Sequence, residues 1–399
     1  MLAIEIIYYI LSGFMVLVFF TWISLLKTMI MDHKKTPKLN TRYMPKMDDK
    51  VSVILPARNE REHIRKCLES LAVQDYKNYE IIAIDDSSDD GTGKIIDDMA
   101  KKYKKIIHVK AGPKPDGWLG KNWPCAQGRK RASGKLLFFT DADTIHSPRA
   151  TSMAVSYMIS EGLDAVTVMP KLLSMDFLTA VTMPMITVFL NTIYSAAKVN
   201  DPSNSTGYFY GSFFIMNAHA YDDIGGHYTT RGEMIEDGVL GRLVKNSRYK
   251  MRIISGRNEV SAIWARDRIT LWNAIKRLIV PIAVSNQRHA IGITIAVAFL
   301  MFIPFLLAPY ALVSPLDGLH SYTLLASSLA SIIMAFLTAA VDSKILGRRI
   351  LYSIFAPLGG AIVTFGFLAG ALIPNGGSVS WRGTKYSNTD CKKSTPNLY

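Results

Sequence analysis

Cysteines and charged side chains are scarce in this sequence. Its 399 residues include only three cysteines, Cys67, Cys125 and Cys391, which lie far apart and form no C-x-x-C pair. We therefore expect neither a disulfide framework nor a zinc site. Charged residues make up 20% of the chain and hydrophobic residues 49%, and the mean hydropathy is +0.16. This balance excludes an intrinsically disordered chain, which needs low hydrophobicity and high charge.

The apolar residues are concentrated near the two ends of the chain. The uninterrupted stretch Ile6–Leu26 is long enough to cross the roughly 30 Å of a bilayer core. It lacks the basic start and the small-residue cleavage site of a signal peptide, so we expect an uncleaved transmembrane anchor over residues 1–27. Three further apolar stretches within residues 291–373 predict about three C-terminal spans.

The excess of basic residues indicates a membrane surface, and not nucleic acid, as the partner. The net charge is +14. Basic residues gather directly after the first apolar stretch, at Lys27, Lys34, Lys35, Lys38, Arg42 and Lys46. Because cytoplasmic loops carry an excess of Lys and Arg, the basic juxtamembrane linker at residues 28–49 places the following domain in the cytoplasm. The sequence thus predicts a multi-pass protein of the cell membrane.

The C-terminal third leaves two points open. A count of spans places the tail, residues 374–399, outside the cell, whereas its Arg382 and Lys385 favour the inside. Pro357 and Gly359 could also break the last apolar stretch into a re-entrant hairpin.

Residues 50–270 read as alternating strands and helices. Strands are expected at residues 51–56, 79–84, 106–109 and 136–139, and helices at residues 64–71, 92–103 and 123–132. This alternation predicts βαβ units and a mostly parallel sheet. In such sheets ligands bind outside the carboxyl ends of the strands.

One apolar stretch interrupts this domain, at residues 172–198. Its Met- and Phe-rich composition favours a helix in the membrane interface over a core helix. A fifth span is least favoured, because an odd extra crossing would put the two halves of the domain on opposite sides. Residues 271–290 are expected to form another interfacial helix.

Two acidic clusters follow predicted strands. Asp85–Thr92 contains four aspartates and could bind a nucleoside, or form a solvated turn that caps the next helix. Asp141 and Asp143 come directly after the strand at 136–139, and alternation along an extended chain points both to one face. Mg²⁺ and Mn²⁺ prefer such oxygen ligands and often pair them with substrate phosphates. A loop with a helix cap is the alternative.

The third acidic cluster is Glu233, Glu236 and Asp237, at a predicted helix start. Glu233 and Asp237 are four residues apart and would share one helix face, where like charges repel. Such repulsion is typical of a metal site, a substrate site or a shifted pKa. A solvated helix face is the alternative.

Between these clusters lies the glycine- and tryptophan-rich loop Asp116–Trp123. Its two glycines allow close backbone approach, Lys121 can meet a phosphate, and a helix start nearby would attract anions. Trp118 and Trp123 are unusual in a surface loop. The loop therefore predicts a contact with a pyrophosphate or a sugar, with a merely aromatic-anchored loop as the alternative.

Taken together, these motifs resemble the inverting family 2 glycosyltransferases of GT-A fold. The resemblance covers about residues 50–270. It rests on Pro56-Ala57-Arg58-Asn59-Glu60, Asp85-Asp86, Asp141-Ala142-Asp143 and Glu236-Asp237. The strings Gly117-Trp118-Leu119-Gly120-Lys121-Asn122-Trp123 and Trp381-Arg382-Gly383-Thr384-Lys385-Tyr386 look like the membrane subgroup that includes carotenoid- and hopanoid-associated enzymes. That subgroup is similar in plan to ceramide glucosyltransferases.

The resemblance implies a GT-A (Rossmann-like) nucleotide-sugar-binding domain and a role for each motif residue. Donor-binding residues would be Pro56, Ala57 and Glu60 around the nucleobase, Asp86 at the base or ribose, Asp141 at the ribose and sugar, and Lys121 at the diphosphate. Asp143 would hold Mg²⁺ or Mn²⁺, and Asp237 would be the general base, with Glu236 in support. Further diphosphate or acceptor contacts are expected from Trp118, Trp123, Arg277, Trp381 and Arg382.

The sequence departs from the family pattern at one motif. Processive relatives carry Gln-x-x-Arg-Trp, whereas residues 272–277 read Trp-Asn-Ala-Ile-Lys-Arg. We therefore predict a metal-dependent enzyme that adds a sugar from a nucleoside diphosphate donor, most simply a UDP-sugar, to a lipid acceptor with inversion. A polysaccharide synthase of the same family and a non-catalytic nucleotide-binding membrane protein are the alternatives.

Overall fold

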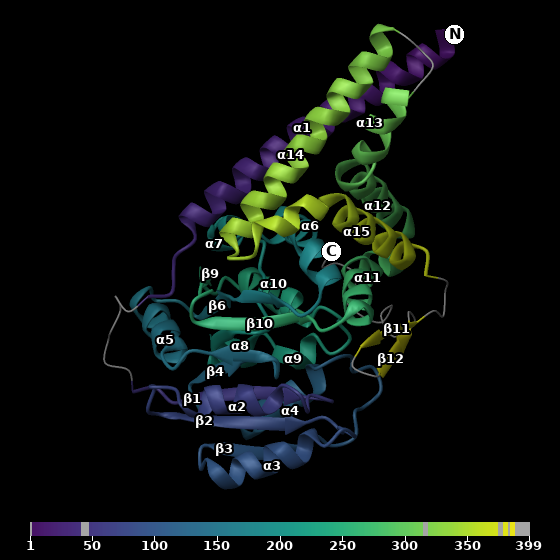
Figure 1. The fold of residues 1–399 in the computed structure, drawn as a ribbon. Helices are drawn as coiled ribbons and strands as arrows, with labels where there is room; N and C mark the ends of the chain where they lie inside the picture. The colour runs from purple at the N-terminus through teal and green to yellow at the C-terminus, as the bar shows by residue number, and fades with distance from the viewer. Residues whose placement is uncertain (1, 41–47, 314–317, 374–377, 382–383, 388–399) are drawn as a thin grey trace. The chain divides into compact units, whose positions relative to one another are not determined.

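The computed structural model describes residues 2–40, 48–313, 318–373, 378–381 and 384–387 (Figure 1). The chain divides into two compact units. The first, called here the apolar helical unit, comprises Met1–Lys35, Ser174–Ser195 and Ala265–Asn375. The second, the α/β unit, comprises Thr36–Leu173, Ala196–Trp264 and Gly376–Tyr399.

A seven-stranded mixed sheet forms the centre of the α/β unit. Its strand order is β3-β2-β1-β4-β8-β6-β9. The strands are β1 (Val51–Ala57), β2 (Tyr79–Asp85), β3 (Ile106–Lys110), β4 (Leu136–Phe139), β6 (Ala165–Met169), β8 (Phe214–Asn217) and β9 (Met251–Ser255). The four strands from β3 to β4 are parallel, and β8 runs antiparallel to both of its neighbours. All four strands predicted from the sequence are present.

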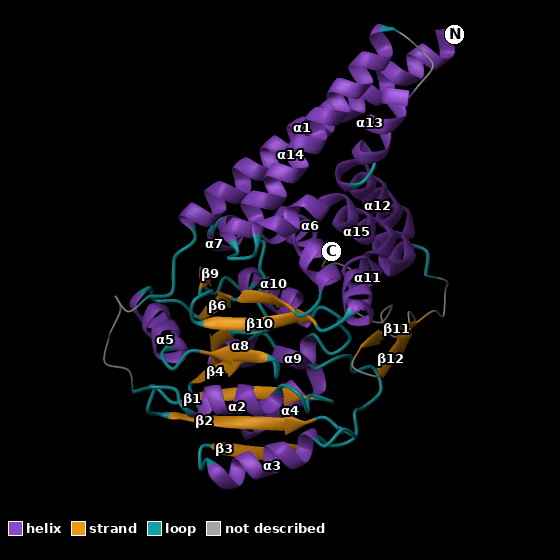
Figure 2. Cartoon of the chain, in the orientation of Figure 1, coloured by secondary structure: helices purple, strands orange, loops and turns teal. Residues whose placement is uncertain are grey.

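Helices cover both faces of this sheet (Figure 2). They are α2 (Ile64–Ala72), α3 (Thr92–Lys102), α4 (Asn122–Arg131), α5 (Ala150–Ser160), α7 (Ala196–Asn200), α8 (Ala218–Asp223), α9 (Gly226–Thr229) and α10 (Glu236–Asn246). Successive residues of β1 point to opposite faces of the sheet and belong to different hydrophobic clusters. Val53 belongs to the cluster that contains Leu68 of α2, and Ile54 to the cluster that contains Cys125 of α4. The predicted α/β class is confirmed.

Two smaller sheets complete the strand inventory of the described residues. The order of the three-stranded one is β5-β10-β7, from β5 (Thr144–His146), β10 (Val260–Ala265) and β7 (Lys171–Ser174). The other is an antiparallel hairpin of β11 (Ser378–Trp381) and β12 (Thr384–Ser387).

The apolar helical unit contains the long hydrophobic helices. They are α1 (Leu2–Lys35), α6 (Phe177–Tyr194), α11 (Arg268–Ser285), α12 (Gln287–Met301), α13 (Pro304–Val313), α14 (Leu319–Ile345), the 3₁₀ helix η1 (Ile350–Phe355) and α15 (Ala356–Ala371). Among the described residues, four segments are long and apolar enough to cross a membrane, and α12 with α13, bent by 54°, would make a fifth. Large apolar side chains such as Leu17 and Ile333 are more than 60% exposed on them, as suits a lipid-facing surface. The protein is therefore membrane-associated.

Several helix boundaries differ from the sequence prediction. The first helix continues past residue 27 to Lys35, and the following residues, Pro37 and Leu39, hydrogen-bond with Ser255 of β9. The last apolar stretch is not broken at Gly359, because α15 is continuous from Ala356. A Cβ at Gly359 would lie 2.4 Å from the carbonyl oxygen of Val181, so the glycine permits close packing of α15 against α6.

The stretch at residues 172–198 becomes β7, α6 and α7. Helix α6 packs against α15 and α14 within the apolar helical unit and is long and apolar enough to cross a membrane. Its location in the interface stays a prediction. The predicted interfacial helix at residues 271–290 corresponds to α11 and the first turn of α12.

Candidate active site

A cleft opens beside the carboxyl end of β1 and the loop that follows β4. It encloses about 320 Å³ of space open to solvent. All six residues predicted to bind the donor line it, together with three others. The lining is Pro56, Ala57, Arg58, Glu60, Asp86, Lys121, Pro124, Asp141 and Ala142. This is the position where ligands bind in sheets of this type.

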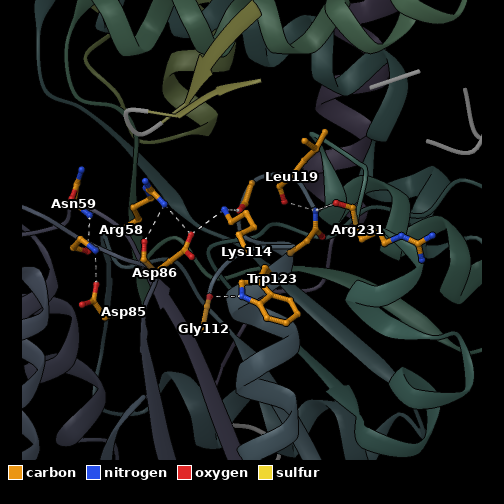
Figure 3. Close-up of polar contacts among 12 residues, drawn as sticks. Arg58, Asn59, Asp85, Asp86, Gly112, Lys114, Leu119, Trp123 and Arg231 are labelled. Carbon is orange, nitrogen blue, oxygen red and sulfur yellow. Dashed lines mark hydrogen bonds and ion pairs between the residues drawn. The ribbon is translucent and has the colours of Figure 1, made fainter. Parts of the chain in front are cut away.

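At one end of the cleft Asp86 lies between two cations. Its Oδ2 is 3.1 Å from Nζ of Lys114 and 3.6 Å from Nη1 of Arg58 (Figure 3). Arg58 also donates to the backbone carbonyl oxygen of Asp86 at 3.1 Å. The parallel register of β1 and β2 pairs Ala57 with Asp85, which brings the next residue of each strand together. Sequence reasoning missed Lys114, since nothing in its loop marks it as a partner of Asp86.

The other polar residues of the Asp85–Thr92 cluster shape the turn. Asp85 accepts a hydrogen bond from the N–H of Ser88, and Asp90 caps Thr92 at the start of α3. The N–H of Asn59, a residue with φ of 54°, donates to Ser88 Oγ (Figure 3). Asp85 and Asp90 therefore hold the turn through hydrogen bonds, although Asp85 is buried and not solvated, and Asp86 is the member that lines the cleft.

Beside Lys121 and Asp141 of the cleft lining, Glu236 and Asp237 complete a group of four charged side chains. Nζ of Lys121 lies 2.8 Å from Oδ1 of Asp141 and 3.1 Å from Oε1 of Glu236. A Cβ added to Gly211 would lie 2.6 Å from Nζ of Lys121 and 2.7 Å from Oδ2 of Asp237. We call Lys121, Asp141, Glu236 and Asp237 the charged centre.

The charges of this centre influence one another. Burial disfavours the ammonium form of Lys121, but Asp141 and Glu236 outweigh burial and hold its pKa above the usual value. Burial, and next the charge of Glu236, raises the pKa of Asp237 to about 7, against the opposing influence of Lys121. A carboxylate with such a pKa can exchange a proton near neutral pH.

The third acidic cluster differs from its prediction. Helix α10 begins at Glu236, so Glu233 lies in the turn before it and does not share a helix face with Asp237. The neighbouring like charges are instead Glu236 and Asp237, both in the first turn. Carboxylates at this position are stabilised by the helix dipole. Glu233 is buried, and its backbone carbonyl accepts a hydrogen bond from Asn122.

Asp143, the predicted metal ligand, is buried in the loop between β4 and β5, two residues after Asp141. Within the described parts of the chain, no three His, Cys, Asp or Glu side chains converge as a metal cage. Asp141 and Asp143 offer oxygen atoms only, which is the donor type that Mg²⁺ and Mn²⁺ accept. Burial, and next Asp143, raises the pKa of the neighbouring Cys67 thiol, so no thiolate competes there.

The loop with two tryptophans is held by aromatic contacts. Trp118 meets Trp123 and Tyr228 edge to face, each at 5.0 Å between ring centroids. Trp123 Nε1 donates to the carbonyl oxygen of Gly112 at 2.9 Å (Figure 3). These contacts agree with an aromatic-anchored loop, and the contact of either tryptophan with a sugar stays a prediction.

Comparison with known proteins gives a match that includes the residues lining the cleft. Residues 52–225 match the model of the Glycosyl transferase family 2 family. This segment of the chain is similar to the family 2 glycosyltransferases. A mannosyltransferase from Pyrobaculum calidifontis, solved in complex with GDP-Man and Mn²⁺, has a similar fold, with a TM-score of 0.55 and 16% identity over 91% of this chain and 99% of that one. The GT-A-like architecture is thereby confirmed.

Two relatives with similar sequences are both 4,4'-diaponeurosporenoate glycosyltransferases. The one from Staphylococcus haemolyticus is 27% identical over 235 residues, which are 56% of this chain and 60% of the relative. The one from Staphylococcus aureus is 24% identical over 212 residues, 52% of this chain and 54% of the relative. The match thus spans less than two thirds of either relative. The predicted resemblance to family 2 and its carotenoid-associated members is confirmed.

Glu236 and Asp237 lie beyond the matched residues 52–225, and so do three of the further predicted contacts. Arg277 lies in α11 of the apolar helical unit, and Trp381 is the last residue of β11. Arg382 lies outside the described residues. The roles of these three residues stay predictions, as do the roles of the residues that line the cleft.

Proposed function

We propose that the protein is a membrane-integral inverting glycosyltransferase that moves a sugar from a nucleoside diphosphate donor to a lipid acceptor. The observation that carries this proposal is the charged centre beside the donor cleft. It combines a protonated lysine with a carboxylate, Asp237, whose pKa is raised to about 7. A leaving diphosphate requires the first group, and a hydroxyl nucleophile requires the second.

The nucleobase would bind at the Asp86 end. A carboxylate accepts a hydrogen bond from a ring N–H, and the flanking cations of Arg58 and Lys114 donate to carbonyl oxygens. Uracil presents an N–H between two carbonyls and fits this arrangement. Guanine presents an N–H beside one carbonyl, whereas adenine has no such edge. A UDP-sugar is therefore the expected donor, with a GDP-sugar as the competitor to test.

In the transfer step the acceptor oxygen would form a bond to the anomeric carbon as the bond from that carbon to the diphosphate breaks. Asp237 would take the proton of an acceptor hydroxyl. Lys121 would offset the charge that develops on the diphosphate. Because the nucleophile enters opposite the leaving group, the configuration at the anomeric carbon inverts.

Mg²⁺ or Mn²⁺ is the proposed cofactor. Asp143 would hold the ion, since Mg²⁺ is commonly bound by one or two carboxylates together with substrate phosphates. Such an ion supplies further charge neutralisation for the diphosphate. A binding mode that relies on the substrate is consistent with the oxygen-only donor set of Asp141 and Asp143.

The acceptor is proposed to be an apolar molecule held at the cytoplasmic face. The long apolar helices support a membrane location, and the basic residues after α1 support a cytoplasmic catalytic domain. The Staphylococcus relatives are named for diaponeurosporenoate, and the ending of this name denotes a carboxylate. A lipid hydroxyl or carboxyl is therefore the acceptor group to test.

The deciding experiment uses the full-length protein in lipid nanodiscs with a panel of UDP- and GDP-sugars and a membrane lipid extract. We expect release of nucleoside diphosphate that requires both substrates, and mass analysis that finds one added hexose on a lipid. Nucleotide binding without release would support the non-catalytic alternative. A ladder of products would support a polysaccharide synthase.

A further inference from the structure

The side chain of Asn122 joins its own loop to a segment far along the chain. Asn122 is the first residue of α4 and is fully buried. Its Nδ2 donates to the carbonyl oxygens of Leu119 at 2.9 Å and of Glu233, 111 residues further on, at 3.1 Å. Its Oδ1 accepts a hydrogen bond from Oγ1 of Thr230 at 2.9 Å. The N–H of Leu119 also donates to the carbonyl oxygen of Arg231 at 2.7 Å.

These contacts, called here the Asn122 junction, lie between two members of the charged centre. Lys121 directly precedes Asn122, and Glu236 follows Glu233 by three residues. Nζ of Lys121 and Oε1 of Glu236 are 3.1 Å apart. Asn122 begins α4, but residues 119–121 and 230–235 belong to no helix or strand, so no regular ladder fixes the spacing of the two segments. The junction supplies that fixed spacing instead.

The junction favours one geometry because its polar groups are buried and paired. An asparagine amide has two N–H donors, and here they serve the carbonyls of Leu119 and Glu233. The hydroxyl of Thr230, which is also fully buried, donates a hydrogen bond to the amide oxygen of Asn122. Removal of any one partner leaves a buried polar group unsatisfied, which is costly. A shift of either segment would break several of these bonds together.

We propose that Asn122 and Thr230 are positioning residues for the glycosyl transfer, which hold Lys121 and Glu236 at the spacing that the reaction needs. They would act through Lys121 on the leaving diphosphate and through Glu236 on Asp237, and neither lines the donor cleft. This inference rests on the proposed function. Displacement of reacting groups by about 1 Å can lower a rate by about 100-fold, so a small loosening is measurable.

The test compares Thr230→Val with Thr230→Ser in the full-length protein. Valine has nearly the shape of threonine but lacks the hydroxyl, whereas serine keeps the hydroxyl. We expect Thr230→Val to lower kcat by about 10- to 100-fold, and Thr230→Ser to restore kcat to within about threefold of wild type. The KM for the donor should change less than kcat in both, because the ion pairs of Asp86 with Arg58 and Lys114 do not involve Thr230.

Asn122→Asp is the second variant, and it decides the matter if Thr230→Val does not fold. It keeps the size and the acceptor atoms of the side chain but removes both donors, so kcat should fall further. Thermal unfolding and UDP binding report whether each variant is folded.

A wild-type kcat in folded Thr230→Val and Asn122→Asp would overturn the positioning role and leave the proposed function intact. Equal losses in Thr230→Val and Thr230→Ser would also overturn it, because packing and not the hydroxyl would then matter. Absence of nucleoside diphosphate release by the wild-type protein would overturn the proposed function and this inference together.

Discussion

Nζ of Lys121 lies 2.8 Å from Oδ1 of Asp141, although the two residues come from different loops of the α/β unit. Glu236 approaches the same ammonium from a third segment. Three carboxylates, including Asp237, thus lie near one partly buried cation. Without it they would repel one another, so Lys121 is expected to stabilise the site as well as to meet the donor.

The first prediction concerns the charge of Lys121. In Lys121→Met, Asp237 loses the cation that lowers its pKa, so this pKa rises. Because Asp237 must be deprotonated to act as a base, the acidic limb of kcat/KM should move to higher pH and the rate at pH 7 should fall. Lys94→Met, at an exposed position on α3, is the matched control. If the acidic limb of kcat/KM lies at the same pH in Lys121→Met and in the wild type, Lys121 does not influence the titrating group.

The second prediction concerns the metal. Asp143→Ala removes the proposed ligand, and turnover should be lost while UDP binding in the absence of metal is retained. Excess chelator should abolish wild-type turnover, and Mn²⁺ or Mg²⁺ should restore it. Asp98→Ala, an exposed carboxylate on α3, should leave the metal response unchanged. Full turnover of the wild-type protein in excess chelator would remove the metal from the proposal.

The strands and most helices of the α/β unit could be predicted because local sequence determines them. The apolar run of β1 ends at a proline and alanine, and its parallel pairing with β2 brings the acidic cluster after Asp85 to the edge of the cleft. The six residues that the family resemblance assigns to the donor all line this cleft, and their role stays a prediction. Each of them follows or precedes a clear strand or helix signal.

Contacts between segments distant in the chain could not be predicted. The start of α10 was predicted too early, at Glu233, because the turn before Glu236 is held by the side chain of Asn122 and not by residues next to it. The pairing of Lys114 with Asp86 likewise depends on how a loop without secondary structure crosses the end of the sheet. Such contacts leave no periodic pattern in either segment.

The third prediction concerns membrane orientation. A cysteine at the exposed position of Lys94 should resist an impermeant thiol reagent in intact cells and react after lysis, because the basic residues after α1 favour a cytoplasmic domain. The native Cys67 and Cys125 are buried, so the background needs only Cys391→Ser. Labelling of Lys94→Cys in intact cells would reverse the orientation and remove access to cytoplasmic nucleotide sugars.

The fourth prediction concerns Gly211. A Cβ there would lie 2.6 Å from Nζ of Lys121 and 2.7 Å from Oδ2 of Asp237, closer than real Cβ contacts allow. Gly211→Ala should therefore separate the two groups and lower kcat by about 10- to 100-fold, as a displacement near 1 Å does. In Gly112→Ala the new Cβ has no neighbour within 4 Å, and this variant is the control. Equal kcat values in the two variants would show that the charged centre tolerates displacement.

The fifth prediction concerns the base. Burial and Glu236 raise the pKa of Asp237 to about 7, so the carboxylate becomes protonated as the pH falls through that value. The protonated form cannot take the acceptor proton, and kcat/KM of the wild-type protein should fall on the acidic side of about pH 7. Asp237→Asn keeps the shape of the side chain but not its basicity. It should lower turnover by about 10²–10⁴-fold, the usual contribution of a general base, with donor binding nearly unchanged. The acidic limb should disappear from the residual activity of this variant.

Glu236→Gln is the matched comparison, and it should change donor affinity as much as rate, because Glu236 contacts Lys121. Turnover of Asp237→Asn within about threefold of wild type, far short of the general-base range, would assign proton removal to another group.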